Sequence, residues 1–193
     1  SEISKILDIE FTKPILLVTF HPETIGIEEN GKLFDEVLKS LSIFKSMQII
    51  FTYPNADLQS SSILRRLEGF VEKNENCHAF KSLGQKMYLS LMSLSNAVVG
   101  NSSSGIIEAP AMKTPTVNIG NRQTGRLFAK SIVSTSCISE DITRAIKKVN
   151  SKSFQKDTMS VDSRYGMGKT SSEILKSLRD VKLTVRKKFY DIP

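Results

Sequence analysis

The chain has 193 residues, 39% hydrophobic and 24% charged, a balance that excludes disordered, collagen-like and mucin-like proteins. This length fits one large α/β domain, or two small ones, with a core that needs no disulfide. The 27 basic side chains outnumber the 20 acidic ones, and the excess is uneven: residues 1–121 carry a net charge of −2 and residues 122–193 carry +9.

Short apolar runs alternate with amphipathic stretches about five times, which predicts strands joined by crossover helices and hence a parallel sheet. The apolar run at 15–20 lies between Pro14 and Pro22, as is typical of a strand buried on both faces. We therefore expect an α/β fold, a Rossmann-like doubly wound parallel sheet, with residues 150–168 forming a polar loop. In chain order, strands are expected at 15–20, 49–53, 77–80, 97–99, 116–119 and near 132–133, and apolar stripes of helices at 33–44, 63–71, 87–92, 106–112, 142–149 and in a long last helix at about 168–183.

Several partner classes are not expected. The basic second part has few interleaved aromatic residues and no nucleic-acid signature, so its charge fits a small anionic ligand or an acidic partner domain better. Cys77 and Cys137 are too few and too scattered for a disulfide scaffold or a zinc site, which favours the cytoplasm. No run of about 18 apolar residues and no signal peptide is present, so no membrane partner is expected. Because the sequence begins without a Met, we expect a piece of a longer chain.

Three serines, Ser102, Ser103 and Ser104, stand between Gly100 and Gly105, where a strand ends and a helix begins. Ligands of a parallel sheet gather at the carboxyl ends of its strands. Backbone N–H groups, hydroxyls and the positive end of the helix dipole would meet at this turn, and that combination binds phosphate. Plain N-capping of the helix is the alternative, although it needs only one serine.

Two more loops follow strand ends. The loop at 120–126 carries Arg122 and Arg126 between two glycines, and arginine suits phosphate because its planar fork donates two bonds at once. Solvated surface arginines are the alternative. His21 ends the first strand, where it either meets a ligand as donor or acid, or only caps and packs. The dinucleotide fingerprint G-x-G-x-x-G is absent there, and we expect no cofactor and no metal.

In this order, the three loops resemble the hydrolysing UDP-N-acetylglucosamine 2-epimerases, in particular the sialic-acid-type branch that produces free N-acetylmannosamine. The resemblance covers nearly the whole chain. It implies the second half of a two-domain enzyme of the glycosyltransferase-B type, so that residues 1–193 form the C-terminal UDP-binding domain and the first, catalytic domain is absent. The matching strings are VTFHPET at 18–24, GNSSSG at 100–105 leading to Glu108, GNRQTGR at 120–126, Y-G-x-G at 165–168 and KKFY at 187–190.

For the diphosphate, the resemblance implies that Ser102 and Ser103, with Ser104 beside them, hold the phosphates at the helix start. Arg122 would neutralise or position the same group. Both implied roles agree with the chemistry expected of a serine turn and a guanidinium.

For the rest of the substrate, the resemblance implies that Glu108 accepts the ribose hydroxyls and that His21 contacts the phosphate or sugar near the departing UDP. Arg126 is a weaker candidate that would orient its loop. In the family's reaction, UDP is eliminated across C1–C2 of the sugar and the intermediate is hydrated with inversion at C2. Because the acid and base carboxylates come largely from the first domain, we expect this chain to bind UDP without turnover.

Two other functions stay open on the sequence: the donor-nucleotide half of a glycosyltransferase-B enzyme, and a non-catalytic nucleotide-binding module. The His21-Pro22 string with the Arg122 loop favours the epimerase over the glycosyltransferase. The expected partners are UDP or UDP-N-acetylglucosamine and the missing N-terminal domain, to which the last helix would cross as in this fold type. A homo-oligomer is compatible with the sequence, which does not give the oligomeric state.

Overall fold

The computed structural model describes residues 2–23, 27–55, 60–166 and 168–182. Thr24 of the first matching string and the KKFY ending lie outside them. Six strands form one sheet in the order β3-β2-β1-β4-β5-β6, and every neighbouring pair is parallel, which confirms the predicted Rossmann-like sheet. The strands are β1 Ile15–Thr19, β2 Gln48–Thr52, β3 Cys77–Phe80, β4 Ala97–Gly100, β5 Thr116–Ile119 and β6 Ile132–Thr135.

The strand order reverses between β1 and β4. The chain first builds outward from β1 to β3, and then returns to lay β4 against the other side of β1, with Val18 opposite Val99 and Thr19 opposite Gly100. In such sheets, the connections after the two central strands leave toward opposite faces and open a crevice at the carboxyl edge. The loops that begin at His21 and Asn101 therefore start side by side at the switch point.

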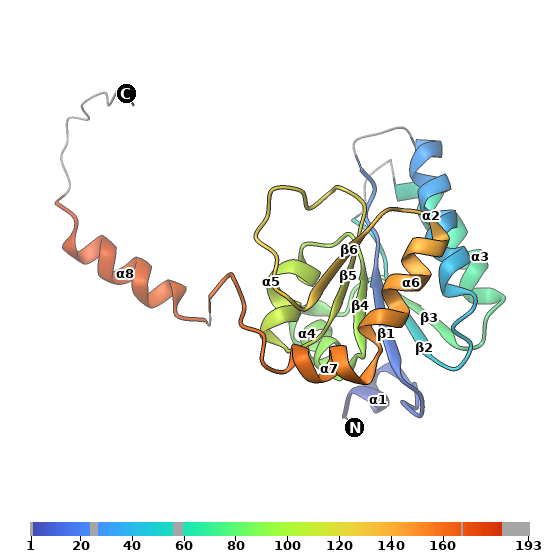
Figure 1. The fold of residues 1–193 in the computed structure, drawn as a ribbon, viewed down its shortest axis with the longest axis horizontal. Coiled ribbons are helices and arrows are strands. Elements are labelled where there is room, and N and C mark those ends of the chain that lie inside the picture. Colours follow the sequence, from blue (N-terminus) through green and yellow to red (C-terminus); the bar gives the residue numbers. More distant parts are fainter. Residues whose placement is uncertain (1, 24–26, 56–59, 167, 183–193) are drawn as a thin grey trace.

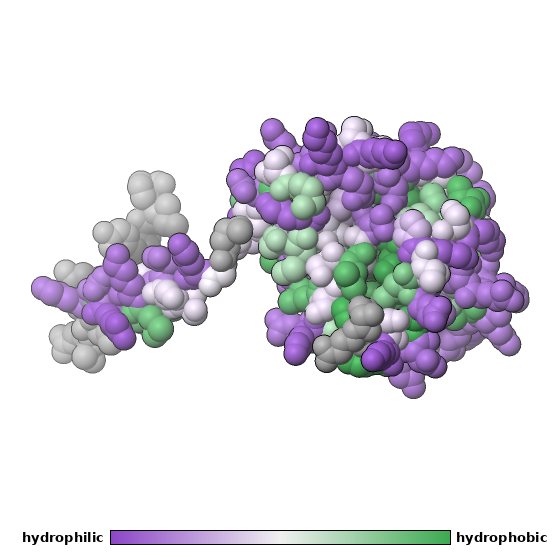
Figure 2. Space-filling model, turned by 90° about the horizontal axis from the view of Figure 1, so that it is seen from below, coloured by the Kyte–Doolittle hydropathy of each residue, from purple (hydrophilic) through white to green (hydrophobic). Residues whose placement is uncertain are grey.

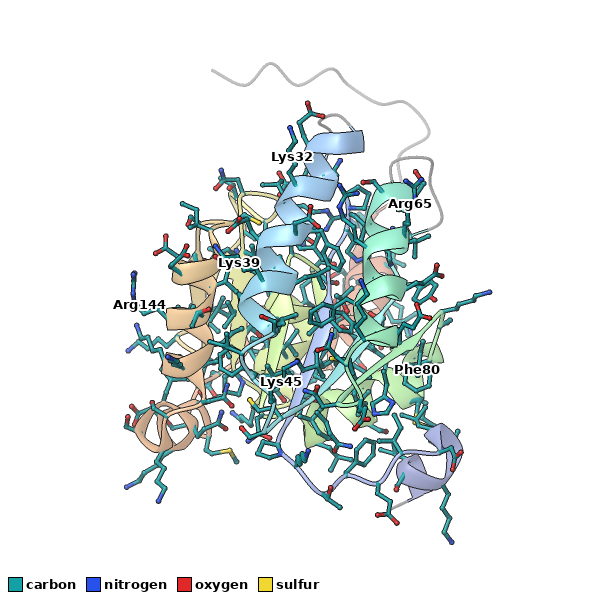
Figure 3. The ribbon with its side chains drawn as sticks, turned by 90° about the vertical axis from the view of Figure 1, so that its right-hand side faces the viewer. Lys32, Lys39, Lys45, Arg65, Phe80 and Arg144 are labelled. Carbon is teal, nitrogen blue, oxygen red and sulfur yellow. The ribbon has the colours of Figure 1, made fainter. Side chains whose placement is uncertain are left out.

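Helices cover both faces of the sheet (Figure 1). On one face, α2 lies between α3 and α6, as Figure 3 shows. On the other face, α4 packs against both α5 and α1. The helices are α1 Glu2–Leu7, α2 Ile27–Leu41, α3 Ser61–Glu72, α4 Gly84–Leu94, α5 Ser104–Ala111, α6 Ser139–Val149, α7 Lys152–Thr158 and α8 Thr170–Asp180.

The core lies between these layers. All five residues of β1 are buried, as its continuous apolar run predicts. The stripe predicted for the first long helix buries Phe34, Val37 and Leu41 against the sheet, because these positions share one face of α2. A second, smaller cluster joins the other face of the sheet to α4 and α5.

The prediction of a loop over 150–168 is wrong in part, because α7 occupies Lys152–Thr158. Its sequence, KSFQKDT, is polar and carries no apolar stripe. The helix forms through contacts distant in sequence: Phe154 packs on the larger core cluster, and Gln155 Nε2 donates to the carbonyls of Asn96 (2.8 Å) and Val149 (2.7 Å). Ser151 caps it by accepting from Phe154 N at 3.4 Å. The N-terminal α1 was also not predicted.

The last helix forms inside its expected range but is shorter, at Thr170–Asp180, and residues beyond 182 are outside the description. It projects away from the rest of the chain (Figures 1 and 2). None of its residues is buried, and Ile174, Leu175 and Leu178 are each more than half exposed. Among the described residues, no helix has the length and apolar content needed to cross a membrane.

Candidate functional site

The serine turn leaves its backbone donors open. Ser103 is the N-cap of α5, but its side chain makes no capping bond, so plain N-capping by its hydroxyl is not what holds this helix start. Ser102 Oγ accepts a long bond from Ser104 N at 3.4 Å instead. Within the described residues, the backbone N–H groups of Ser102 and Ser103 donate to no acceptor. Unpaired N–H groups at a helix start are suited to an anion.

Gly100 lets the end of β4 lie directly against the end of β1. Its φ is +137°, and a Cβ built there would stand 1.9 Å from the carbonyl oxygen of Thr19. No side chain can occupy that space. The next residue, Asn101, then donates its backbone N–H to the same carbonyl at 3.2 Å. The glycine thereby brings the serine turn beside the loop that follows β1.

Asn101 connects all three predicted loops, and sequence reasoning did not single it out. Its side chain is fully buried, accepting from the backbone N of His21 at 2.7 Å and donating to the backbone O of His21 at 2.8 Å. Its own carbonyl accepts from Gln123 Nε2 at 2.7 Å and from an Arg122 guanidinium nitrogen at 3.2 Å. The only sequence signal for Asn101 is its place in the GNSSSG string. It lies 80 positions after His21 and 21 positions before Arg122.

The loop after β1 is held from both sides. Asn30, a fully buried residue of α2, bonds the backbone N and O of Glu23 at 2.8 and 3.0 Å, just as Asn101 bonds His21. The His21 ring accepts from Asn55 N at its Nδ1 (3.4 Å). Gly120 lies against this loop, because a Cβ there would stand 3.1 Å from Glu23 Oε1.

Glu108 lies one turn along α5 from Ser104. Its Oε2 is buried and accepts no hydrogen bond within the described part of the chain. A buried carboxylate oxygen normally has a donor, so this atom is an acceptor left unsatisfied by the described residues. The position of Glu108 on the serine-turn helix agrees with the sequence prediction.

The two arginines differ. Arg122 is exposed but is tied to the serine turn through its bond to Asn101 O. The Arg126 guanidinium is exposed and makes no hydrogen bond or ion pair with residues that the structure describes. Its backbone N donates to Gln123 O at 3.3 Å. Through Asn101, the structure therefore joins the loops that carry His21, the serines and Arg122, while Glu108 lies further along α5 and the Arg126 side chain is not brought to this group.

Two tyrosines also reach these loops. Tyr165, from the Y-G-x-G string, accepts from Leu127 N at 3.0 Å and so braces the arginine loop. Tyr88 of α4 lies with its hydroxyl 2.7 Å from Ser104 Oγ, and Ser104 Oγ donates to Ser102 Oγ at 3.0 Å. The sequence places Tyr88 only on an inward face of its helix. No local pattern indicates that its hydroxyl meets a serine 16 positions later.

Other chemistry lies elsewhere. A cavity of about 560 Å³ is lined by Lys130 and by residues of and after α7, near the amino ends of the strands and so at the opposite end of the sheet from the serine turn. Figure 2 views the molecule from that end.

Neither a reactive thiol nor a metal cluster is found in the described residues. Burial raises the pKa of Cys137 to about 12, with Glu23 and Glu36 adding to the shift, so this thiol is a poor nucleophile. In the described ranges, no cluster of His, Cys, Asp or Glu could hold a metal ion.

Known proteins resemble this chain over most of its length. A family model described as UDP-N-acetylglucosamine 2-epimerase matches residues 1–179. The chain is 36% identical to a GDP/UDP-N,N'-diacetylbacillosamine 2-epimerase (hydrolyzing) of Campylobacter jejuni, covering 99% of this chain and 50% of the relative. It is 31% identical to the polysialic acid biosynthesis protein P7 of Escherichia coli, and the match covers 94% of this chain and 47% of that relative. The chain thus spans about half the length of the curated relatives it matches.

Solved structures show the same fold. A UDP-GlcNAc 2-epimerase from Neisseria meningitidis bound to UDP-GlcNAc superposes with a TM-score of 0.69 at 14% identity, over 93% of this chain and 48% of that one. Glycosyltransferases of lipopolysaccharide synthesis also superpose, at TM-scores of 0.57 and 0.54. The fold is therefore shared by both kinds of sugar enzyme.

Proposed function

The chain belongs to the UDP-N-acetylglucosamine 2-epimerase family, and we propose that it is the UDP-binding half of a hydrolysing enzyme that converts UDP-N-acetylglucosamine and water to N-acetylmannosamine and UDP. The single observation that carries the proposal is the convergence of three loops on Asn101 at the switch point of the sheet. The names of the relatives support the hydrolysing reaction and a sialic-acid-type pathway.

The diphosphate would lie at the start of α5. The N–H groups of Ser102 and Ser103, which donate to no acceptor in the described residues, are suited to an acceptor-only ligand, and the dipole of the helix adds a favourable field. Arg122 would complete the site with the guanidinium donors that its bond to Asn101 leaves unused. When the bond between the sugar and the diphosphate breaks, negative charge grows on the leaving phosphate, and donors already in place stabilise it without reorganisation.

The nucleoside and the sugar would lie on either side of that anchor. Glu108 Oε2, buried without a donor in the described residues, would accept from the ribose hydroxyls. His21, whose backbone is held by Asn101, would contact the phosphate or sugar near the departing UDP. Arg126 would orient its loop.

Epimerisation also needs a base that removes the C2 proton. We assign that base to a first domain, since the relatives are about twice as long as this chain. The exposed apolar side chains of α8 would pack on that domain. The purified chain should therefore release no UDP from UDP-N-acetylglucosamine. Sustained UDP release, measured by a coupled assay, would contradict this division of labour.

UDP binding is the direct test. Isothermal titration calorimetry of the chain should detect UDP, and Ser102→Ala, Arg122→Ala and His21→Ala should each weaken it by about 1.5–3 kcal/mol, because each removes a charge-assisted bond. Arg144→Ala is the charge-matched control, since Arg144 lies on the outer side of α6 and pairs only with Asp141 among described residues (Figure 3). It should leave UDP affinity unchanged. If Arg144→Ala weakens UDP as much as Arg122→Ala does, the serine turn is not the anion site.

The two alternatives have less support. The glycosyltransferases share the fold, but the family match is to epimerases, and the two relatives named above are an epimerase and a polysialic acid biosynthesis protein. A non-catalytic binding module would show the same UDP affinity, but a longer chain bearing the first domain would then turn over no substrate. We place the protein in the cytoplasm, where Cys77 and Cys137 stay reduced as the structure has them.

A further inference from the structure

A chain of three hydroxyl groups runs from α4 into the serine turn. Tyr88 lies on α4 with its ring against the smaller core cluster. Its hydroxyl is 2.7 Å from Ser104 Oγ, and Ser104 Oγ is 3.0 Å from Ser102 Oγ. A packed tyrosine ring has only two rotatable bonds, so its hydroxyl stands at a well-defined point. The serine hydroxyls, in contrast, rotate freely unless a partner orients them.

The direction of the hydrogens in this chain follows from counting. Each hydroxyl has one hydrogen to donate. The Ser104 hydroxyl donates its one hydrogen to Ser102 Oγ, so Tyr88 must be the donor in the bond between Tyr88 and Ser104. Ser102 Oγ accepts from Ser104 Oγ and, at 3.4 Å, from Ser104 N. It donates to no acceptor among the described residues, so its own hydrogen is available to a ligand.

We propose that Tyr88 is a positioning residue that acts through Ser104 to aim the Ser102 hydroxyl at the diphosphate. This inference rests on the proposed UDP site and names one of the groups that prepares it. Because donors in a hydrogen-bonded chain polarise one another, Ser102 becomes a better donor when it already accepts from Ser104. The ligand class that benefits is an anion with acceptor-only oxygens, such as a nucleoside diphosphate.

Removing the tyrosine hydroxyl would allow the hydrogen bond between the two serine hydroxyls to reverse its direction. In Tyr88→Phe, Ser104 Oγ has lost its donor and can accept from Ser102 instead. Ser102 would then turn its hydrogen inward and present a lone pair to the phosphate. The variant keeps the aromatic ring and therefore its packing against the core cluster, so the fold should be retained.

A double-mutant cycle on the purified chain tests the proposal. UDP affinity is measured by calorimetry for the unaltered chain, Tyr88→Phe, Ser102→Ala and the double variant. Tyr88→Phe should weaken UDP about five- to tenfold in the unaltered background, but less than about twofold when Ser102 is already alanine. A structural role of Tyr88 would weaken binding equally in both backgrounds, and that result would overturn the proposal.

Tyr53→Phe is the matched control, because the Tyr53 hydroxyl donates to Glu68 on α3 and does not contact the serine turn. It should leave UDP affinity within about twofold of the unaltered chain. Equal UDP affinity in Tyr88→Phe and Tyr53→Phe overturns the role of Tyr88 while leaving the proposed function intact. Absence of UDP binding by the unaltered chain overturns the proposed function and the role of Tyr88 together.

Discussion

Asn101→Ala isolates the tie between the serine turn and the loop after β1. The substitution removes the two side-chain bonds to the His21 backbone, of 2.7 and 2.8 Å, but keeps the Asn101 carbonyl that Gln123 and Arg122 contact. Each lost bond is worth about 1 kcal/mol net, and leaving its partner unpaired adds to the cost. His21 is only half-buried, so water replaces part of what is lost. We expect a loss of about 2–3 kcal/mol.

Urea unfolding followed by circular dichroism measures this loss. For a chain of this size, a decrease of about 2–3 kcal/mol corresponds to a melting temperature about 5–10 °C lower. Asn121→Ala is the control, because Asn121 is exposed and its side chain makes no hydrogen bond within the described residues. It should change stability by less than about 0.5 kcal/mol. If the two variants are equally stable, Asn101 does not hold the loops together and the reasoning about the site fails.

Three further results are expected. Gly100→Ala should lower the free energy of unfolding by at least about 3 kcal/mol, because its Cβ would overlap a β1 carbonyl. Gly69→Ala, in open space on α3, should raise the free energy of unfolding by about 0.5–1 kcal/mol. Urea unfolding compares the two variants, and equal changes in both would contradict the close approach of β1 and β4. Burial raises the pKa of Cys77 to about 11 and that of Cys137 to about 12, which lowers the fraction of reactive thiolate in the native chain. At about pH 8, both cysteines should therefore react with a thiol reagent at least about 100-fold slower in the native chain than in urea. Burial lowers the pKa of His78, so this side chain protonates more readily in the unfolded chain than in the folded one. The free energy of unfolding should therefore fall as the pH drops below about 6.5, and His78→Gln should flatten that part of the pH profile.

The secondary structure was largely readable from local pattern. Buried strands such as β1 are apolar throughout, and the stripe of Phe34, Val37 and Leu41 repeats with the helical period, so both signals lie within a dozen neighbouring residues. Where the local pattern was absent, the prediction failed. The polar α7 forms because Phe154 packs on the larger core cluster, and because Gln155 donates to the carbonyls of Asn96, just before β4, and of Val149 on α6.

The candidate site divides in the same way. Residue chemistry at strand ends was sufficient to select the serine turn, His21 and the arginine loop, since phosphate prefers helix starts and guanidinium groups. Sequence did not indicate that Asn101 would bind the His21 backbone, or that Tyr88 would reach Ser104. Those contacts depend on which strands are neighbours and on how α4 packs beside α5.

The strands, most helices and the kinds of side chain at each strand end follow from the chemistry of adjacent residues, so the amino-acid pattern predicts them. Which strand ends meet depends on burying the whole sheet between two helical layers at once, and no local pattern contains that information. That packing places β4 beside β1, and it is why one buried asparagine, 80 positions from its histidine partner, joins the three loops.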